Sequence, residues 1–325
     1  MAEKTSFSMR TKEELARIYP EKACCRLAEL AALIRMDGTV ILGSAGQIGW
    51  YLTTEYAAVA RKVYSLIKDV FGLEAEITVS RQKHLKRITL YQVQVPARDD
   101  GRYLLQELGI LKKGAEKGIV SGIDKGLLPS QCCRRCYLRG IFLGAGSVSN
   151  PDGNYHLEII ASDLRLAQDV ASLMNRFAPI RAKLSHRKHW HVVYLKDSEQ
   201  ISAFMSVIGA HRALLDFENT KIMKGMKNQV NRLVNCETAN LGKTVDAAMR
   251  QVENIHLIEA VLGLEHLSKP LEELARLRLA NPEINLKELG ELMNPPLGKS
   301  GINHRMRKLE ELAGDLRLRG GTQEN

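Results

Sequence analysis

The chain has 325 residues, more than one hydrophobic core usually holds, so we expect two or three domains. Its 45% hydrophobic and 26% charged residues are typical of a folded globular protein and exclude a disordered chain, a collagen or a coiled-coil rod. A formal charge of +10 favours a polyanionic partner, and the 5% aromatic content favours double-stranded over single-stranded nucleic acid. No apolar run approaches the roughly 18 residues of a membrane span, and the first residues lack the charge pattern of a signal peptide, so we predict a cytoplasmic protein with no membrane partner.

Two segments of the first 224 residues resemble each other. After an N-terminal segment of residues 1–19, residues 23–40 align without gaps on residues 131–148, at an offset of 108 positions. Six of the 18 aligned residues are identical, including the Cys-Cys-Arg sequence of both segments. This similarity predicts an internal duplication, with one repeat over residues 20–115 and the second over 128–224.

The elements of both repeats follow the same predicted order. Apolar residues recur at helical spacing over 57–71 and 163–177, and each of these helices lies between segments with the alternation of β-strands. A further helix, apolar and rich in small residues, begins each repeat. The pattern predicts an α+β fold in which each repeat runs helix, two strands, helix, two strands, helix, an αββαββα order.

The first helix of each repeat carries a recognisable motif. Residues 30–38, Leu-Ala-Ala-Leu-Ile-Arg-Met-Asp-Gly, resemble the LAGLIDADG helix of homing endonucleases, and residues 138–146 resemble it more weakly. The resemblance implies that the two helices pack closely side by side through small residues such as Ala31, Ala32 and Gly140. It also implies two antiparallel sheets that form a saddle over the DNA major groove.

The catalytic acids of that family are incomplete in this chain. Such endonucleases use one acid at the end of each paired helix, because two close carboxylates hold divalent metal ions on the scissile phosphates. Asp37 occupies the first position, but Ala145 occupies the second, and Arg35 replaces another acid of the motif. We therefore predict no catalytic residues and no enzymatic activity, with Asp37 serving as the end of a helix. The alternative is a residually active LAGLIDADG nuclease or maturase that combines Asp37 with an acid outside the motif, such as Asp152.

The spacing of cysteines and histidines predicts no metal site. Cys132, Cys133 and Cys136 lack a fourth ligand at a familiar spacing, so we expect the cysteines to be reduced and mostly buried thiols. Three histidines between residues 186 and 191 lie beside Arg187 and Lys188, whose charge disfavours a bound cation. We predict no metal and no cofactor.

The densest positive charge lies in two predicted hairpins at corresponding places of the repeats. We predict that these side chains contact the DNA backbone, because Lys and Arg neutralise phosphates and release their counterions. Charge runs are also common at solvated hairpin tips, and the same surface would suit a protein partner, so both alternatives stay open. The predicted backbone contacts are Arg81, Lys83, Lys86 and Arg87 in the first hairpin and Arg181, Lys183, Arg187 and Lys188 in the second.

The composition and periodicity of the sequence change after residue 224. Residues 225–251 are rich in Asn and predict a polar, basic bridge, and residues 252–318 return to helical periodicity. Residues 251–325 carry a net charge of −2, so the rest of the chain carries +12. Most of the charge that would face a polyanion therefore lies outside the last region.

Two short helices within about residues 285–316 have the pattern of a helix-turn-helix. The first has a leucine stripe that includes Leu292, and the second begins at Ser300, a candidate N-cap, with Ile302 and Met306 on its apolar side. We expect the polar side of the second helix to contact base edges and phosphates, and a helical hairpin that serves only for packing is the alternative. The predicted DNA contacts are Lys299, Ser300, Asn303, His304, Arg305, Arg307 and Lys308.

A degenerate two-copy LAGLIDADG region followed by a helix-turn-helix is similar to the WhiA family of bacterial sporulation and cell-division regulators. The similarity spans residues 11–316 and is most specific at residues 231–240, Asn-Arg-Leu-Val-Asn-Cys-Glu-Thr-Ala-Asn, and in stretches between residues 286 and 305. It implies a non-enzymatic, nucleoid-associated transcription regulator that acts in cell division, chromosome segregation or sporulation. The implied partners are double-stranded DNA and, in actinobacteria, a second transcription regulator of the WhiB type.

Overall fold

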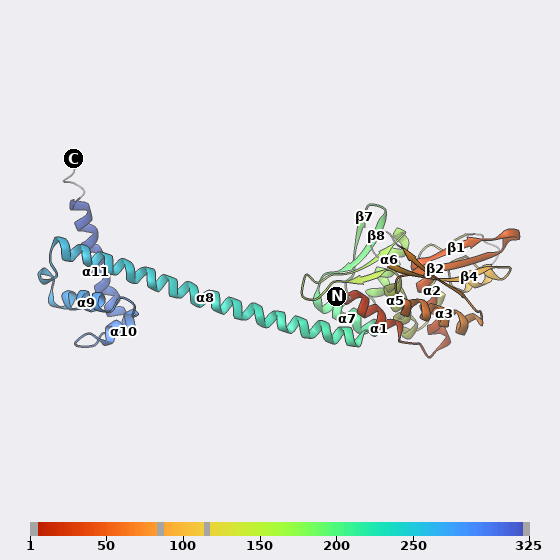
Figure 1. The fold of residues 1–325 in the computed structure, drawn as a ribbon, viewed down its shortest axis with the longest axis horizontal. Helices are drawn as coiled ribbons and strands as arrows, with labels where there is room; N and C mark the ends of the chain where they lie inside the picture. Colours follow the sequence, from red (N-terminus) through yellow and green to blue (C-terminus); the bar gives the residue numbers. More distant parts are fainter. Residues whose placement is uncertain (1–5, 83–87, 114–117, 321–325) are drawn as a thin grey trace. The chain divides into compact units, whose positions relative to one another are not determined.

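The structure is a computed structural model that describes residues 6–82, 88–113 and 118–320 (Figure 1). Its contacts divide the chain into two compact units, Met1–Gly225 and Met226–Asn325, and each unit is described by itself. Among the described residues, no helix is both long enough and apolar enough to cross a membrane.

The first unit contains the two repeats, preceded by helix α1 (Phe7–Ala16). Each repeat follows the order helix, two strands, helix, two strands, helix, which confirms the predicted αββαββα arrangement and the α+β class. The first repeat consists of α2 (Ala23–Asp37), β1 (Gly38–Leu42), β2 (Ile48–Thr54), α3 (Ala57–Phe71), β3 (Glu76–Gln82), β4 (Ile88–Arg98) and α4 (Gly101–Glu107). The second consists of α5 (Gln131–Ala145), β5 (Gly146–Val148), β6 (Leu157–Ala161), α6 (Leu164–Met174), β7 (Lys183–Arg187), β8 (Trp190–Leu195) and α7 (Ser198–Ile208). Two short 3-10 helices, η1 (Ser44–Gly46) and η2 (Lys125–Leu127), lie in the connections.

Both sheets are four-stranded and antiparallel, and their strand orders correspond: β1-β2-β4-β3 and β5-β6-β8-β7. One face of each sheet packs into the core of the unit, where the paired residues Leu52 and Val93 of the first sheet are fully buried. Ile159 and Val193 are the equivalent buried pair of the second sheet. Because successive side chains of a strand point to opposite faces, their neighbours along each strand belong to a second, more exposed face. We call it the open face.

The two LAGLIDADG-like helices, α2 and α5, form a closely packed pair. Residues 108 positions apart face each other along it, and the Sγ atoms of Cys25 and Cys133 are 3.9 Å apart. A Cβ atom at Gly140 would lie 2.5 Å from the Glu29 carbonyl oxygen and 2.8 Å from the Ala32 Cβ, so a larger residue would push the helices apart. This approach confirms the packing through small residues that the motif implied.

A buried ion cluster connects the helix pair to its surroundings. The Glu29 carboxylate on α2 accepts from Lys62 Nζ on α3 at 2.5 Å, and from Arg139 Nη2 and Nε on α5 at 2.6 and 2.9 Å. Glu29 is fully buried, and the two cations are only 3% and 7% exposed. Lys62 Nζ also donates to the carbonyl oxygens of Leu15 and Ile18, at 3.0 and 2.5 Å. One carboxylate therefore compensates two buried cations and joins four helical regions.

Local sequence explains where several helices begin and end. Side chains that accept a hydrogen bond from the third helical N–H begin three helices of the second repeat. These N-caps are Ser130 for α5, Asp163 for α6 and Asp197 for α7. The predicted helix over 57–71 coincides with α3, whereas α6 ends at Met174, three residues before its predicted end. The reason is Asn175, whose side-chain oxygen accepts a hydrogen bond from Ala182 N at 2.6 Å and holds the chain in a turn.

The second unit is built from helices, as the sequence predicted. It contains the later part of α8 (His211–Val261), then η3 (Leu264–His266), α9 (Lys269–Ala280), α10 (Leu286–Glu291) and α11 (Lys299–Gly320). Its buried core consists of Ile255, Ile258, Leu264, Leu274, Ala275, Leu289, Met293, Ile302, Met306, Leu309 and Ala313. Each of the last four helices contributes to this core, so the unit has a hydrophobic centre of its own.

Helix α8 passes through the boundary between the units. The sequence indicated only a polar, basic bridge over residues 225–251, whereas the structure has these residues in a continuous helix. Every residue from 225 to 246 is exposed, including Met226, Leu233 and Leu241. Because none of these 22 residues packs into a core, no buried face imposes the apolar pattern by which a helix is predicted.

We expect Glu29→Gln to destabilise the first unit by about 3–5 kcal/mol, because the change leaves Lys62 and Arg139 buried without a compensating charge. The matched control is Glu74→Gln, which removes a carboxylate from an exposed pair with Lys68 at 3.9 Å and should cost at most about 1 kcal/mol. Urea unfolding of both variants measures the difference. Equal unfolding midpoints for the two variants would show that the cluster does not hold the unit together.

Candidate nucleic-acid interface

Helix α11 presents a row of polar and basic side chains on one side. Ser300, Asn303, His304, Arg307 and Lys308 follow the spacing i, i+3, i+4, i+7 and i+8, which places them on the same side of a helix, and all five are exposed. Of the other predicted contacts, Lys299 is exposed and Arg305 is half-buried. No hydrogen bond or ion pair engages the side chains of these seven residues, all of which the structure describes, so their donors are free for a ligand.

The opposite side of α11 is anchored in the core of the second unit. Ile302, Met306 and Leu309 are at most 3% exposed, which confirms the predicted apolar stripe. The predicted start of the helix is wrong by one residue. Helix α11 begins at Lys299, and Ile302 N donates to Gly298 O at 3.1 Å, so Ser300 lies in the first turn and is not the N-cap. This change leaves Ser300 on the exposed side.

The connection between α10 and α11 is held by a close backbone contact. Leu297 N donates to Gly290 O at 2.9 Å, and a Cβ atom at Gly290 would collide with the Leu297 carbonyl oxygen. Asn285 begins α10 with a capping box, in which its side chain and that of Glu288 each accept a backbone N–H of the other residue. Leu292 was predicted to point inward but is 51% exposed, because α10 ends at Glu291 and the chain leaves the helical period there.

A buried arginine positions the helix that precedes this pair. Arg278 on α9 is 2% exposed, and its Nη1 atom donates to the carbonyl oxygens of Ile284 and Asn281 at 2.7 and 3.4 Å. These bonds hold the loop between α9 and α10, and burial lowers the pKa of the guanidinium. The resulting arrangement is a packed helix, a tight turn and a second helix whose basic side chains make no hydrogen bonds within the protein. This is the geometry of a helix-turn-helix that places one helix in a DNA groove.

The second sheet carries two of the predicted backbone contacts on its open face. Lys183 pairs with Tyr194, which in turn pairs with Glu158, so these three side chains point to the same side. Arg187, four residues after Lys183, shares this face and forms a partly exposed ion pair with Glu158 at 3.2 Å. Such a pair contributes at most about 1 kcal/mol, so a phosphate could displace it at little cost. The two cations are thus available to a polyanion.

The remaining cations of this hairpin lie at its ends. Lys188 is in the turn between β7 and β8, with a positive φ of 54°, and its side chain is exposed. Arg181 precedes β7 and is also exposed, while its backbone N–H donates to Gln200. The structure therefore brings Lys183 and Arg187 together on one face and leaves Lys188 and Arg181 at the edges.

The first hairpin differs from the second. Arg81 pairs with Thr89, which lies on the same face of the sheet as the core residue Val93, so the exposed Arg81 points away from the open face. Lys83, Lys86 and Arg87 lie outside the described residues. The open face of this sheet carries the acid Glu76 and several neutral polar side chains instead, and the alternation of residues along the strands was the signal that could have located them. They include Tyr51, Thr53, Thr78, Gln92 and Gln94.

The ends of the helix pair hold a single acid of the motif. Asp37 ends α2 and Ala145 ends α5, so no second carboxylate faces Asp37 from the corresponding position. The Asp37 side chain is exposed, yet nearby protein atoms partly desolvate it and raise its pKa, while the charge of Lys12 opposes this shift. Burial lowers the pKa of Lys12 to about 8, and Arg35 Nη2 donates to the Val120 carbonyl oxygen at 2.5 Å. Two basic groups therefore lie on this end of the pair.

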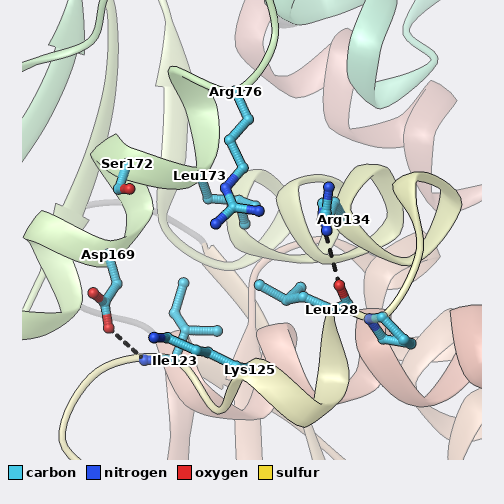
Figure 2. A pocket seen from close by; sticks show the side chains of 9 residues that line it. Ile123, Lys125, Leu128, Arg134, Asp169, Ser172, Leu173 and Arg176 are labelled. Atoms are coloured by element: carbon cyan, nitrogen blue, oxygen red, sulfur yellow. Dashed lines mark hydrogen bonds between the residues drawn. The ribbon is translucent and has the colours of Figure 1, made fainter.

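A basic pocket between η2, α5 and α6 was not predicted from the sequence. Figure 2 shows Arg134 of α5 and Arg176, which follows the end of α6, entering the pocket, with Lys125 on a third side. Asp169 offers the one carboxylate of the lining, and its Oδ2 atom accepts a hydrogen bond from Ile123 N at 2.9 Å. The cations come from separate segments, so no local charge run marked them in the sequence.

Cysteines form the group of side chains best suited to hold a metal ion. Within the described residues, the ligand atoms of Cys24, Cys25 and Cys133 lie close enough together for one ion, and neither Asp37 nor Asp152 belongs to such a group. Hydrogen bonds from Ser130 and Cys25 lower the pKa of the Cys132 thiol to about 7, whereas burial raises the pKa of Cys25 and Cys133. These thiols lie at the N-terminal ends of α2 and α5, at the opposite end of the pair from the Asp37 position.

Comparison with known proteins assigns the family. Residues 23–111 match the WhiA N-terminal LAGLIDADG-like domain, residues 134–227 the WhiA LAGLIDADG-like domain and residues 230–313 the WhiA C-terminal HTH domain. The chain is 53% identical over 316 residues to the probable cell division protein WhiA of Heliobacterium modesticaldum, covering 97% of this chain and 98% of that protein. It is 54% identical over 312 residues to the protein of the same name from Desulforamulus reducens, covering 96% of each. The crystal structure of full-length DUF199/WhiA from Thermatoga maritima shares the fold, with a TM-score of 0.55 at 24% identity over 96% of this chain and 99% of that one. The chain therefore belongs to the WhiA family.

Proposed function

We propose that this protein is a DNA-binding transcription regulator whose helix α11 reads base pairs. The observation that carries the proposal is the exposed row on α11, whose side chains are free of internal hydrogen bonds while the opposite side is buried. Asn303 and Arg307 lie in this row, and these residue types can bond bidentately to adenine and guanine in the major groove. Lys299, Arg305 and Lys308 are assigned to phosphates, which position a helix without reading sequence.

The cellular process follows from the relatives. Both relatives named above are called probable cell division proteins. We extend this role to the present chain, as a regulator acting at the nucleoid in cell division, chromosome segregation or sporulation. The proposal is compatible with a unit that has its own core and presents one uncommitted basic helix.

The open face of the second sheet has a supporting role in this proposal. Lys183 and Arg187 lie on that face together, and residues 1–250 carry the positive charge of the chain, with a net +12. Contacts of this kind add affinity for any duplex through counterion release. Because the open face of the first sheet presents neutral polar side chains and the acid Glu76, we assign the charge contacts to the second sheet.

The first unit is proposed to bind DNA without cutting it. Asp37 is left without a carboxylate at the corresponding position of α5, and Lys12 and Arg35 lie on this end of the helix pair. A two-metal mechanism requires acidic ligands that hold both ions, and positive groups there oppose metal binding. We therefore assign the helix pair a structural role.

Base recognition by α11 is tested with Asn303→Ala and Arg307→Ala. Each change should reduce the difference in binding free energy between target and random DNA by about 1–3 kcal/mol, roughly 5- to 150-fold in the affinity ratio, since each removes a bidentate base contact. The target is the set of genomic fragments that the intact protein enriches, and competition titrations measure the ratio. Lys299→Ala and Lys308→Ala are the matched controls, because loss of a phosphate contact should weaken all sequences alike. The assignment fails if the two base-contact variants keep the wild-type ratio.

The role of the second sheet is tested by the salt dependence of binding. The double variant Lys183→Ala and Arg187→Ala should reduce the slope of log affinity against log salt by roughly 0.9 per lost phosphate contact. The double variant Arg61→Ala and Lys68→Ala removes the same charge from the exposed side of α3 and should leave the slope unchanged. Equal slopes for wild type and the first variant would assign this face to a protein partner or to solvent.

Absence of nuclease activity is tested on supercoiled and linear DNA with magnesium or manganese. We expect both substrates to stay intact, because one carboxylate does not rebuild the two-metal arrangement. Gel electrophoresis after prolonged incubation detects nicks and breaks. Cleavage that disappears in Asp37→Ala would instead establish the nuclease alternative.

A further inference from the structure

Cysteines from both repeats meet where the two repeats pack together. Cys24 and Cys25 are the second and third residues of α2, and Cys132 and Cys133 occupy the same positions of α5. Because residues 108 positions apart face each other along the helix pair, the fold brings Cys133 of the second repeat to Cys24 and Cys25 of the first, with Cys132 next to it in the chain. The sequence showed no fourth ligand near Cys132 and Cys133, since their partners come from the other repeat.

The distances between these sulfur atoms suit a single metal ion. The Sγ atoms of Cys24, Cys25 and Cys133 all lie within 4.8 Å of one another, and those of Cys25 and Cys133 are 3.9 Å apart. Cys132 is not one of these three, since its sulfur lies 3.1 Å from Ser130 Oγ, and it would become the fourth ligand by a rotation of its side chain. A tetrahedral zinc ion with Zn–S bonds of about 2.3 Å holds its sulfurs about 3.8 Å apart. The Cys25–Cys133 separation is close to this value.

The four cysteines share one position in their helices. All lie in the first turn, where the helix dipole favours negative charge, whereas burial acts in the opposite direction and raises the pKa of Cys25 and Cys133. The fifth nearby cysteine, Cys136, is engaged elsewhere, because Arg139 Nη2 lies 3.2 Å from its sulfur. This leaves four ligands, two from each helix, which is the number that a closed tetrahedral site requires.

We propose that Cys24, Cys25, Cys132 and Cys133 form a tetrahedral site for one zinc ion that fastens the two repeats together. Zinc is favoured among soft-metal ions because it takes four thiolates in this geometry without redox chemistry. A four-iron cluster would need its thiolates farther apart than these sulfurs lie. Binding converts four thiols to thiolates and releases their protons to solvent, so affinity rises with pH. With every position filled by protein, the ion is structural.

The proposal is tested with the full-length protein, purified under reducing conditions and stripped with a chelator. Cobalt(II) serves as the spectroscopic probe, and one equivalent should produce the intense visible bands of tetrahedral cobalt and the near-ultraviolet absorption of thiolate coordination. One equivalent of zinc should then displace it and raise the melting temperature. Cys236→Ser, which changes an exposed cysteine on α8, is the control and should bind as the wild type does.

Variants at the less buried ligands separate metal binding from folding. Cys24→Ser and Cys132→Ser should weaken zinc binding by more than the roughly 10- to 100-fold that loss of an outer-shell partner costs. Cys24→His keeps a ligand atom, so it should retain cobalt with a shifted spectrum, which an unfolded protein would not show. The proposal is overturned if the wild type takes up no cobalt or zinc, or if the serine variants bind as tightly as the wild type. A disulfide between Cys25 and Cys133 in protein prepared with zinc would also overturn it.

Discussion

The buried carboxylate of Glu29 is the constraint on which the first unit depends. Taking Lys62 and Arg139 out of water costs several kcal/mol for each ion, and this one acceptor compensates both. Lys62 bonds to the end of α1, and Arg139 Nη1 reaches the Ile208 carbonyl oxygen at the end of α7. Five helices are thereby fixed around one carboxylate. Strands β2 and β6 pack on α2 and α5, so the two sheets are attached to the same group of helices.

Much of the fold could be predicted because burial leaves a periodic trace in sequence. Helix α3 coincides with its predicted range since Val59, Val63 and Ile67 recur at the spacing that one buried helix face requires. The same logic oriented α11, because the spacing of its apolar stripe is enough to identify the exposed side. The duplication was visible for another reason: identical residues at a constant offset of 108 positions occupy the contact between α2 and α5.

The rest depends on contacts that sequence spacing does not encode. Cys133 lies 108 positions after Cys25 in the chain, so the proximity of Cys24, Cys25 and Cys133 exists only in the folded unit. The side to which Arg81 points depends on the register between β3 and β4, and a shift of one residue would reverse it. The start of α11 depends on where the backbone turns at Gly298, and Ser300 looked like an N-cap because its residue type suits that position.

Gly140 has a consequence for which positions of the helix pair tolerate substitution. Its missing side chain is what allows α2 and α5 to touch, so selection for folding alone preserves this part of the motif. Asp37 and Ala145 lie at the ends of the same helices, where no comparable packing restricts the residue type. Packing therefore restricts the middle of the motif, whereas the acid at its end is restricted only by chemistry. A substitution at the end of a helix can therefore remove an acid of the motif while the packing of the helix pair survives.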